Sequence, residues 1–273
     1  MNLDELSADT VAIVGVPHDI HSSFMRGPAE GPAVIRQVLE AGSANLCAEN
    51  GYSIEENSRV HDLGNLPITN DEAGYWQIEE HITRILETDS KILTLGGDHA
   101  IAYPVIHAHA QKYEGLTVVQ LDAHPDLYDE LDGDRYSHAC PFARLMETGR
   151  VKRLVQIGIR TMTTHQRAQA HKFGVEVIEM RHWNPRAILG LQEPLYLTID
   201  LDVLDPAFAP GISHHEPGGM TMRELLRLIQ DLNTPLVGAD IVELNPVRDL
   251  SNMTAMVAAK LLKEVTVKLL GEG

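Results

Sequence analysis

The chain has 273 residues, of which 44% are hydrophobic, and its formal net charge is -17. Nucleic acid is a poor partner for such a chain, because phosphates are neutralised by clustered Lys and Arg, whereas a cationic small molecule would be attracted. We also expect no membrane partner and a cytoplasmic location, because no apolar run approaches the roughly 20 residues of a membrane span and the first residues have neither a secretory nor a transit-peptide pattern.

Short apolar runs rich in β-branched residues alternate with helical patterns, which is typical of parallel strands joined by crossover helices. In chain order, the predicted elements are a strand at Val11–Val16, a helix near Pro32–Glu40, a helix near Tyr75–Glu87, a strand at Ile92–Leu95, a helix near Ala102–Tyr113, a strand at Leu116–Leu121, a helix near Pro141–Thr148, a strand at Leu154–Ile159, a helix near Thr164–Phe173, a strand at Val175–Ile178, a strand at Leu195–Leu201, a helix near Met222–Asp231, a strand at Leu236–Val242 and a helix near Thr254–Leu270. We therefore expect a three-layer α/β/α fold with a mostly parallel central sheet. Because no repeat, low-complexity tract or linker interrupts residues 1–273, we predict a single domain.

Acidic residues and histidines follow three of the predicted strands. The three motifs are Gly96-Gly97-Asp98-His99, Asp122-Ala123-His124-Pro125-Asp126 and Asp200-Leu201-Asp202. Alternate residues of an extended segment share a side, so Asp122, His124 and Asp126 can point into one pocket. One such motif at a strand end is usually a cap or a turn. Three together would bury many carboxylates that repel one another, and divalent cations remove that repulsion.

The types of ligand in these motifs indicate which metal they would bind. Mostly carboxylate ligands with one or two imidazoles favour manganese over zinc or copper. The only cysteines, Cys47 and Cys140, are far apart in the sequence and form no Cys-based zinc motif. The sequence therefore predicts a manganese site built from oxygen and imidazole ligands.

These motifs resemble the signature of the ureohydrolases, the arginase and agmatinase family. The resemblance covers nearly the whole chain, because it extends to Gly15-Val16-Pro17, Gly31-Pro32, Leu204-Asp205-Pro206, Pro217-Gly218-Gly219 and Glu243-Leu244-Asn245-Pro246. It implies an arginase-like fold, a homotrimer or homohexamer, and two Mn²⁺ ions per chain. The implied ligands are His99 and Asp126 for one ion, His124 and Asp202 for the other, and Asp122 and Asp200 as bridges.

The activity implied by the resemblance is hydrolysis of a guanidino compound to an amine and urea. Two neighbouring metal ions make water a nucleophile near neutral pH, and collapse of the tetrahedral intermediate requires a proton for the leaving amine. His138 matches the family's catalytic histidine, and Glu243 matches the carboxylate that binds the guanidinium group. We expect these two residues and the ligand Asp126 to be catalytic, with His138 and Glu243 also contacting the substrate.

The loop at residues 127–135 bears on the choice of substrate. Its charged residues are Asp129, Glu130, Asp132, Asp134 and Arg135. Such a loop would repel a carboxylate and attract an amine, and we expect Asp129 to contribute to substrate binding. The sequence therefore predicts agmatine, hydrolysed to putrescine and urea, in preference to arginine or another guanidino acid such as guanidinobutyrate.

Four further histidines lie where they could meet a substrate. His214 and His215 belong to the long loop at roughly Val203–Met220, where many family members carry a short Thr- and Gly-rich stretch. Open α/β sheets bind ligands beside such strand-end loops, so His214 is a further candidate for substrate binding. His18 and His21 follow the first strand and could line the entrance.

Two functions of other classes stay open. One is a non-catalytic relative that keeps the fold for binding or assembly, and the other is a deacylase that uses a single zinc ion. Retention of all six candidate ligands together with His138 and Glu243 argues against the first, and the two carboxylate pairs argue against the second. Metal analysis separates the ureohydrolase from these two alternatives. The ureohydrolase predicts two manganese ions per chain, the non-catalytic relative predicts no metal, and the deacylase predicts one zinc ion.

Overall fold

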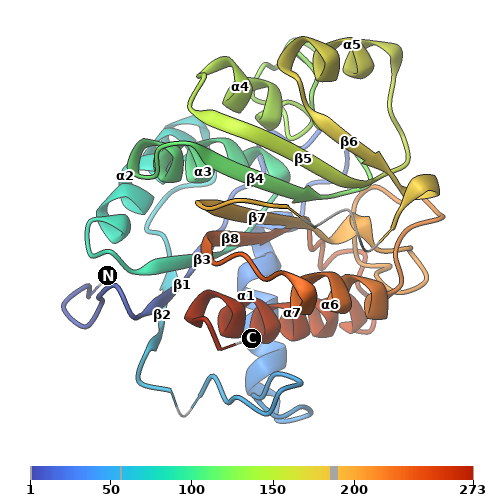
Figure 1. Ribbon diagram of the computed structural model, residues 1–273. Helices are drawn as coiled ribbons and strands as arrows, with labels where there is room; N and C mark the ends of the chain where they lie inside the picture. The colour runs from blue at the N-terminus through green and yellow to red at the C-terminus, as the bar shows by residue number, and fades with distance from the viewer. Residues whose placement is uncertain (1, 56, 185–189, 273) are drawn as a thin grey trace.

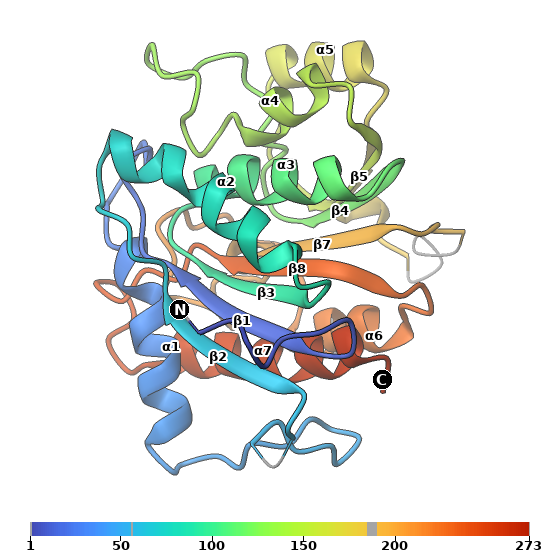
Figure 2. The same cartoon turned by 90° about the vertical axis from the view of Figure 1, so that its left-hand side faces the viewer.

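The computed structural model describes residues 2–55, 57–184 and 190–272. These residues form a three-layer structure in which helices cover both faces of an eight-stranded sheet (Figures 1 and 2). The strand order is β2-β1-β3-β8-β7-β4-β5-β6, and every pair of neighbours is parallel. The expected α/β/α fold class is confirmed.

The bounds of the elements follow the predicted pattern closely. The strands are β1 (Val11–Val16), β2 (Val60–Asn65), β3 (Lys91–Gly96), β4 (Leu116–Leu121), β5 (Val151–Ile159), β6 (Glu176–Glu179), β7 (Leu195–Asp200) and β8 (Leu236–Val242). The α-helices are α1 (Gly31–Glu40), α2 (Glu72–Leu86), α3 (Ala102–Lys112), α4 (Pro141–Glu147), α5 (Thr164–Phe173), α6 (Met222–Asp231) and α7 (Met253–Leu270). Short 3-10 helices include η2 (His99–Ile101) and η5 (Leu201–Val203).

Among the differences from the sequence-based expectation, those at β2 and α2 have clear local reasons. Strand β2 was not expected, because it is a polar strand at the edge of the sheet that pairs with β1 alone and carries no apolar run. Helix α2 begins three residues earlier than expected. The Asp71 carboxylate accepts a hydrogen bond from the Gly74 amide at 2.9 Å and so caps the first turn.

The two sides of the sheet build two separate apolar clusters. In β1, Val11 and Ile13 point into one cluster while Ala12 and Val14 point into the other, as the alternation of a strand requires. Helices α1, α6 and α7 pack on the first side, and α2, α3 and α4 pack on the second (Figure 1). The central strands are therefore buried on both faces, which explains their nearly continuous apolar sequences.

The parallel arrangement places the carboxyl ends of all the strands at one edge of the sheet. The four strands that precede the metal motifs and Glu243 are β3, β8, β7 and β4, and they are consecutive in the sheet. Residues that are distant in the sequence are thereby brought to one place, where open α/β sheets bind their ligands. Among the described residues, no helix combines the length and apolar character needed to cross a membrane.

Candidate metal centre and active site

A first group of ligands surrounds His99, at the start of η2. Its Nδ1 atom lies 3.1 Å from Asp122 Oδ2, 3.0 Å from Asp126 Oδ2 and 3.3 Å from Asp200 Oδ2. All four side chains are buried. The three carboxylates thus converge on a single imidazole nitrogen.

A second group of ligands lies beside the first and shares one carboxylate with it. His124 Nδ1 lies 2.8 Å from Asp202 Oδ2 and 3.6 Å from Asp122 Oδ1. Asp122 therefore offers one oxygen to each histidine, and the two groups could each hold a metal ion. The structure brings together all six residues that the sequence motifs proposed as ligands.

The chemistry of this cluster fits divalent cations. Burial and the nearby charge of Asp122 raise the pKa of Asp126 to about 6, and burial with the charges of Asp202 and Asp122 raises the pKa of Asp200. His99 Nδ1 is buried, and no donor or acceptor among the described residues makes a hydrogen bond with it. Cations between these carboxylates would relieve their repulsion and would use that nitrogen as a ligand.

The backbone near the centre is shaped by close approaches. A Cβ atom at Gly97 would lie 1.8 Å from the His18 carbonyl oxygen, so only glycine fits between β3 and the loop after β1. The Glu243 amide donates to the Gly97 carbonyl oxygen at 2.9 Å, which joins the end of β8 to the same turn. Asp126 and Glu243 both adopt positive φ angles, of 47° and 68°. Such angles are unusual for residues other than glycine and are frequent at functional sites.

A buried chain of hydrogen bonds orients His99. Its Nε2 atom lies 3.0 Å from Thr198 Oγ1, and the Thr198 hydroxyl donates to Asp240 Oδ1 at 2.6 Å. The Tyr196 hydroxyl donates to Asp240 Oδ2 at 2.9 Å. Because Nε2 is held in this way, Nδ1 faces the carboxylates. These residues were not predicted from the sequence, although an acidic residue within the apolar run of β8 was a signal that pointed to Asp240.

A similar chain supports Asp122. Gln120 Nε2 donates to Asp122 Oδ2 at 2.7 Å and to the His124 carbonyl oxygen at 3.0 Å. Gln156 Nε2 donates to Gln120 Oε1 at 2.6 Å. Both glutamines are fully buried in central strands, and such polar residues in apolar runs were also not singled out from the sequence.

His138 and Glu243 form a buried ion pair beside the ligands. His138 Nδ1 lies 2.8 Å from Glu243 Oε1, which also accepts a hydrogen bond from the His99 amide at 2.9 Å. Burial alone would lower the pKa of His138, but the attraction to Glu243 outweighs it and raises that pKa to about 9. Burial likewise opposes ionisation of Glu243, and attraction to His138 keeps its pKa below the usual value. His138 therefore carries a proton near neutral pH.

These groups line a cavity of about 150 Å³, whose wall also includes Ser23, Tyr128 and His214. The His214 ring lies 5.8 Å from the ring of His124 and 5.3 Å from that of His138, measured between centroids. Its Nε2 atom is buried, and no hydrogen-bond partner for it exists in the described part of the chain. Burial lowers the pKa of His214. His214 therefore lies, largely neutral, where a substrate could meet it.

The structure places Asp129 outside this cavity and gives its charge other partners. The Asp129 carboxylate accepts hydrogen bonds from Arg144 and Arg135, each at 3.0 Å. Asp134, in the same loop, is paired with His21 at 2.7 Å. The expected acidic entrance is therefore partly neutralised within the protein, which argues against the binding role expected for Asp129.

The other three histidines named from the sequence also lie outside the cavity. His18 Nε2 lies 3.0 Å from the Asp71 carbonyl oxygen, and His18 and His21 both pack against Tyr75. His215 Nε2 lies 2.8 Å from the Pro210 carbonyl oxygen. These contacts give all three histidines structural roles at the loops around the site.

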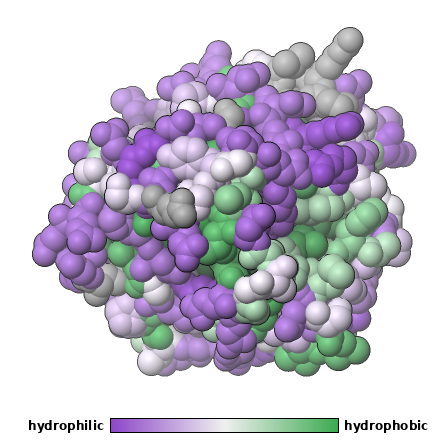
Figure 3. Space-filling model, turned by 90° about the horizontal axis from the view of Figure 1, so that it is seen from below, coloured by the Kyte–Doolittle hydropathy of each residue, from purple (hydrophilic) through white to green (hydrophobic). Residues whose placement is uncertain are grey.

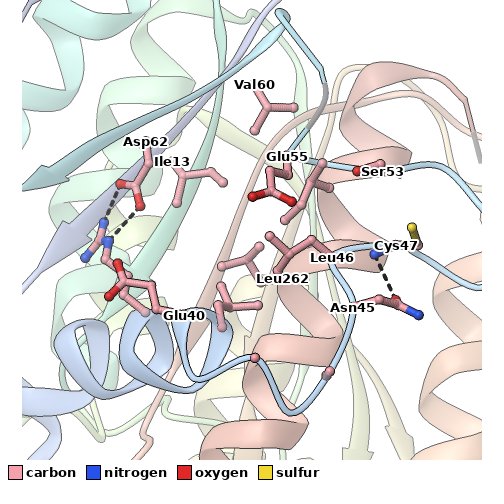
Figure 4. A pocket seen from close by; sticks show the side chains of 15 residues that line it. Ile13, Glu40, Asn45, Leu46, Cys47, Ser53, Glu55, Val60, Asp62 and Leu262 are labelled. Atoms are coloured by element: carbon pink, nitrogen blue, oxygen red, sulfur yellow. Dashed lines mark hydrogen bonds and ion pairs between the residues drawn. The ribbon is translucent and has the colours of Figure 1, made fainter.

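A larger cavity, of about 800 Å³, lies elsewhere, between α1, β2 and the segment at residues 42–55 (Figure 4). Hydrophobic residues such as Ile13, Leu46 and Leu262 line it, and Arg36 is bound to Asp62 through two hydrogen bonds of 2.8 Å. Seen from below, hydrophobic residues of the molecule gather in a hollow surrounded by hydrophilic ones (Figure 3). This cavity contains none of the candidate ligands, so its size does not make it the reaction site.

Comparison with known proteins supports the resemblance seen in the motifs. A model of the arginase family matches residues 9–267. The mitochondrial arginase 1 of Arabidopsis thaliana is 42% identical over 278 residues, which cover 95% of this chain and 81% of the relative. An agmatinase of Bacillus cereus is 35% identical over 266 residues, which cover 93% of this chain and 90% of the relative.

Solved structures show the same relationship. The arginase of Medicago truncatula superimposes with a TM-score of 0.90 at 40% identity, over 96% of this chain and 88% of that one. Proclavaminate amidinohydrolase from Streptomyces clavuligerus superimposes with a TM-score of 0.87 at 28% identity, over 97% of this chain and 93% of that one. The motifs, the fold and these similarities together establish that the chain belongs to the arginase family.

Proposed function

We propose that this protein hydrolyses L-arginine to L-ornithine and urea, using two Mn²⁺ ions. The observation that carries the choice of arginine is the greater identity to plant arginases, 42%, than to agmatinases, 35%. The pairing of Asp129 with Arg135 and Arg144 also supports it, because the loop then repels a substrate carboxylate less than its sequence suggested. Arginine thereby replaces agmatine as the preferred substrate.

The six candidate ligands would hold the two ions, with Asp122 shared between the two groups and Asp126 in the group around His99. When bound, the ions would supply a nucleophile by lowering the pKa of water, and they would add positive charge to a cluster of buried carboxylates. Thr198, Asp240 and Gln120 keep the ligands His99 and Asp122 in position. The residues of the chain thus prepare the site before a substrate binds.

Glu243 and His138 act on the substrate itself. Glu243 Oε1 is engaged by the His99 amide and by His138, so Oε2 is the oxygen that can accept hydrogen bonds from a guanidinium group. His138 holds a proton that the leaving amine needs when the carbon–nitrogen bond breaks. Since Nδ1 of His138 faces Glu243, that proton is on Nε2.

The decisive experiment compares catalytic efficiency on arginine, agmatine and guanidinobutyrate, measured by urea release at equal manganese loading. We expect arginine to be hydrolysed most efficiently. A higher kcat/KM for agmatine would restore the substrate first expected from the loop sequence and would contradict this proposal. Metal analysis of the same sample should give two manganese ions per chain, whereas a single zinc ion would contradict the two-metal centre.

Two further expectations belong to this proposal. The protein should form a homotrimer or a homohexamer, which light scattering of the purified protein would test. A cytoplasmic location is expected from the sequence, although the plant relatives are named as mitochondrial enzymes, and fractionation of the source cells would decide between the two compartments.

A further inference from the structure

Ser23 presents a hydroxyl group to His138 at the wall of the active-site cavity. Its Oγ atom lies 2.8 Å from His138 Nε2, and Ser23 belongs to the wall of the cavity that four of the candidate ligands and Glu243 also line. When both ring nitrogens of His138 carry protons, Nδ1 donates to Glu243 and Nε2 donates to Ser23. The hydroxyl hydrogen of Ser23 is then free to be donated into the cavity.

The loop that carries Ser23 is held on both sides. On one side, the Ser22 hydroxyl donates to Asp98 Oδ2 at 2.9 Å. On the other, the Met25 carbonyl oxygen accepts hydrogen bonds from Asn245 Nδ2 at 2.9 Å and from the Ser213 hydroxyl at 3.2 Å. These anchors come from three of the strand-end segments that surround the centre. These hydrogen bonds hold the loop, so the position of Ser23 relative to His138 is set by the fold.

This geometry presents a difficulty for direct proton transfer from His138. Both of its ring nitrogens already face protein groups, Glu243 on one side and Ser23 on the other. A leaving amine that approached Nε2 directly would compete with Ser23 for the same hydrogen bond. Passage of the proton through the hydroxyl avoids this competition.

We propose that the Ser23 hydroxyl carries the proton from His138 to the nitrogen of the leaving amine. As the carbon–nitrogen bond of the tetrahedral intermediate breaks, its electron pair stays with the nitrogen and takes the hydroxyl hydrogen of Ser23. The Nε2–H bond of His138 breaks at the same time, and its proton forms a new O–H bond on Ser23. Ser23 ends unchanged, His138 becomes neutral, and the amine is released. This inference rests on the proposed function, since it concerns the same reaction.

The test uses the dependence of the rate on the basicity of the leaving group. L-Canavanine has an oxygen in place of the carbon next to the guanidine group, so its leaving nitrogen is much less basic than that of arginine and needs less help from an acid. We expect Ser23→Ala to lower kcat for arginine by about tenfold or more, and kcat for canavanine by about threefold or less, as for loss of an acid catalyst. Ser23→Thr keeps a hydroxyl and should restore most of the rate on arginine.

Ser22→Ala is the matched control, because it loosens the same loop without touching His138. It should affect arginine and canavanine equally, and metal content and the melting temperature should be unchanged in the Ser23 variants. An equal loss on both substrates in Ser23→Ala, or a normal rate on arginine, would overturn the relay. Failure of the wild-type enzyme to release urea from arginine would contradict the proposed function instead.

Discussion

The metal centre and the loop at residues 127–135 are both rich in acids, but the protein treats their charges differently. The ligands Asp122, Asp200 and Asp202 are buried at strand ends, and no Lys or Arg pairs with them among the described residues. Asp129, by contrast, is 45% exposed and is held by two arginines. Buried acids whose only basic partners are histidines indicate a metal site, whereas the role of acids on an exposed loop can be judged only when their ion-pair partners are known.

The largest effect should follow from breaking the shared ligand of the centre. Asp122→Asn replaces a carboxylate that lies in both ligand groups, so we expect activity to fall below detection and manganese content to drop. Asp231→Asn, at the end of α6, is a control acid far from the site. Retention of two manganese ions and full activity by Asp122→Asn would contradict the shared role of Asp122.

Loss of the proton donor should leave the metals in place. We expect His138→Asn to lower kcat by about 10²-fold or more, because general acid catalysis is lost, with manganese content unchanged. His107→Asn, on α3 and paired with Glu79, is the matched control and should behave as the wild type. If manganese disappears along with activity, His138 is a ligand and its assigned role is wrong.

An intermediate effect is expected from the buried chain behind His99. Asp240→Asn weakens the acceptor of the Thr198 hydroxyl, and partners of metal ligands typically change metal affinity or activity by about 10- to 100-fold. Tyr196→Phe removes only the other hydrogen bond to Asp240 and should have a smaller effect. Titration of manganese into the apo protein measures both. A lower melting temperature with unaltered manganese affinity would show that Asp240 stabilises the fold and does not support the metal ligand His99.

The contrast between centre and loop also explains what the sequence could predict. His99, Asp122 and Asp202 could be located because the pattern of strands and crossover helices fixes where strand ends meet, whatever the details of the side chains. Asp240 and Gln120 were harder to predict as site residues, because the role of a polar residue in a buried strand depends on its hydrogen-bond partner on a neighbouring segment. The neutralisation of Asp129 depends on Arg144, which comes from α4 and packs against the loop, and no local pattern encodes that contact.

The smallest effect should come from the loop acids. The sequence of the loop, which includes Asp129 and Glu130, predicted that its acids attract the amine of agmatine. In the structure, Asp129 does not line the cavity, and its charge is balanced by ion pairs with the exposed Arg135 and the buried Arg144. An exposed ion pair such as Asp129–Arg135 contributes only about 0.2–1 kcal/mol. The double variant Asp129→Asn, Glu130→Gln should therefore change the ratio of kcat/KM for arginine to that for agmatine by about threefold or less. Repeating the assay at high salt provides the control, because a charge that steers substrate loses its influence as ions screen it. A tenfold shift of the ratio toward arginine, largest at low salt, would contradict this prediction. It would show that these acids favour an amine over a carboxylate in the substrate, as the sequence of the loop predicted.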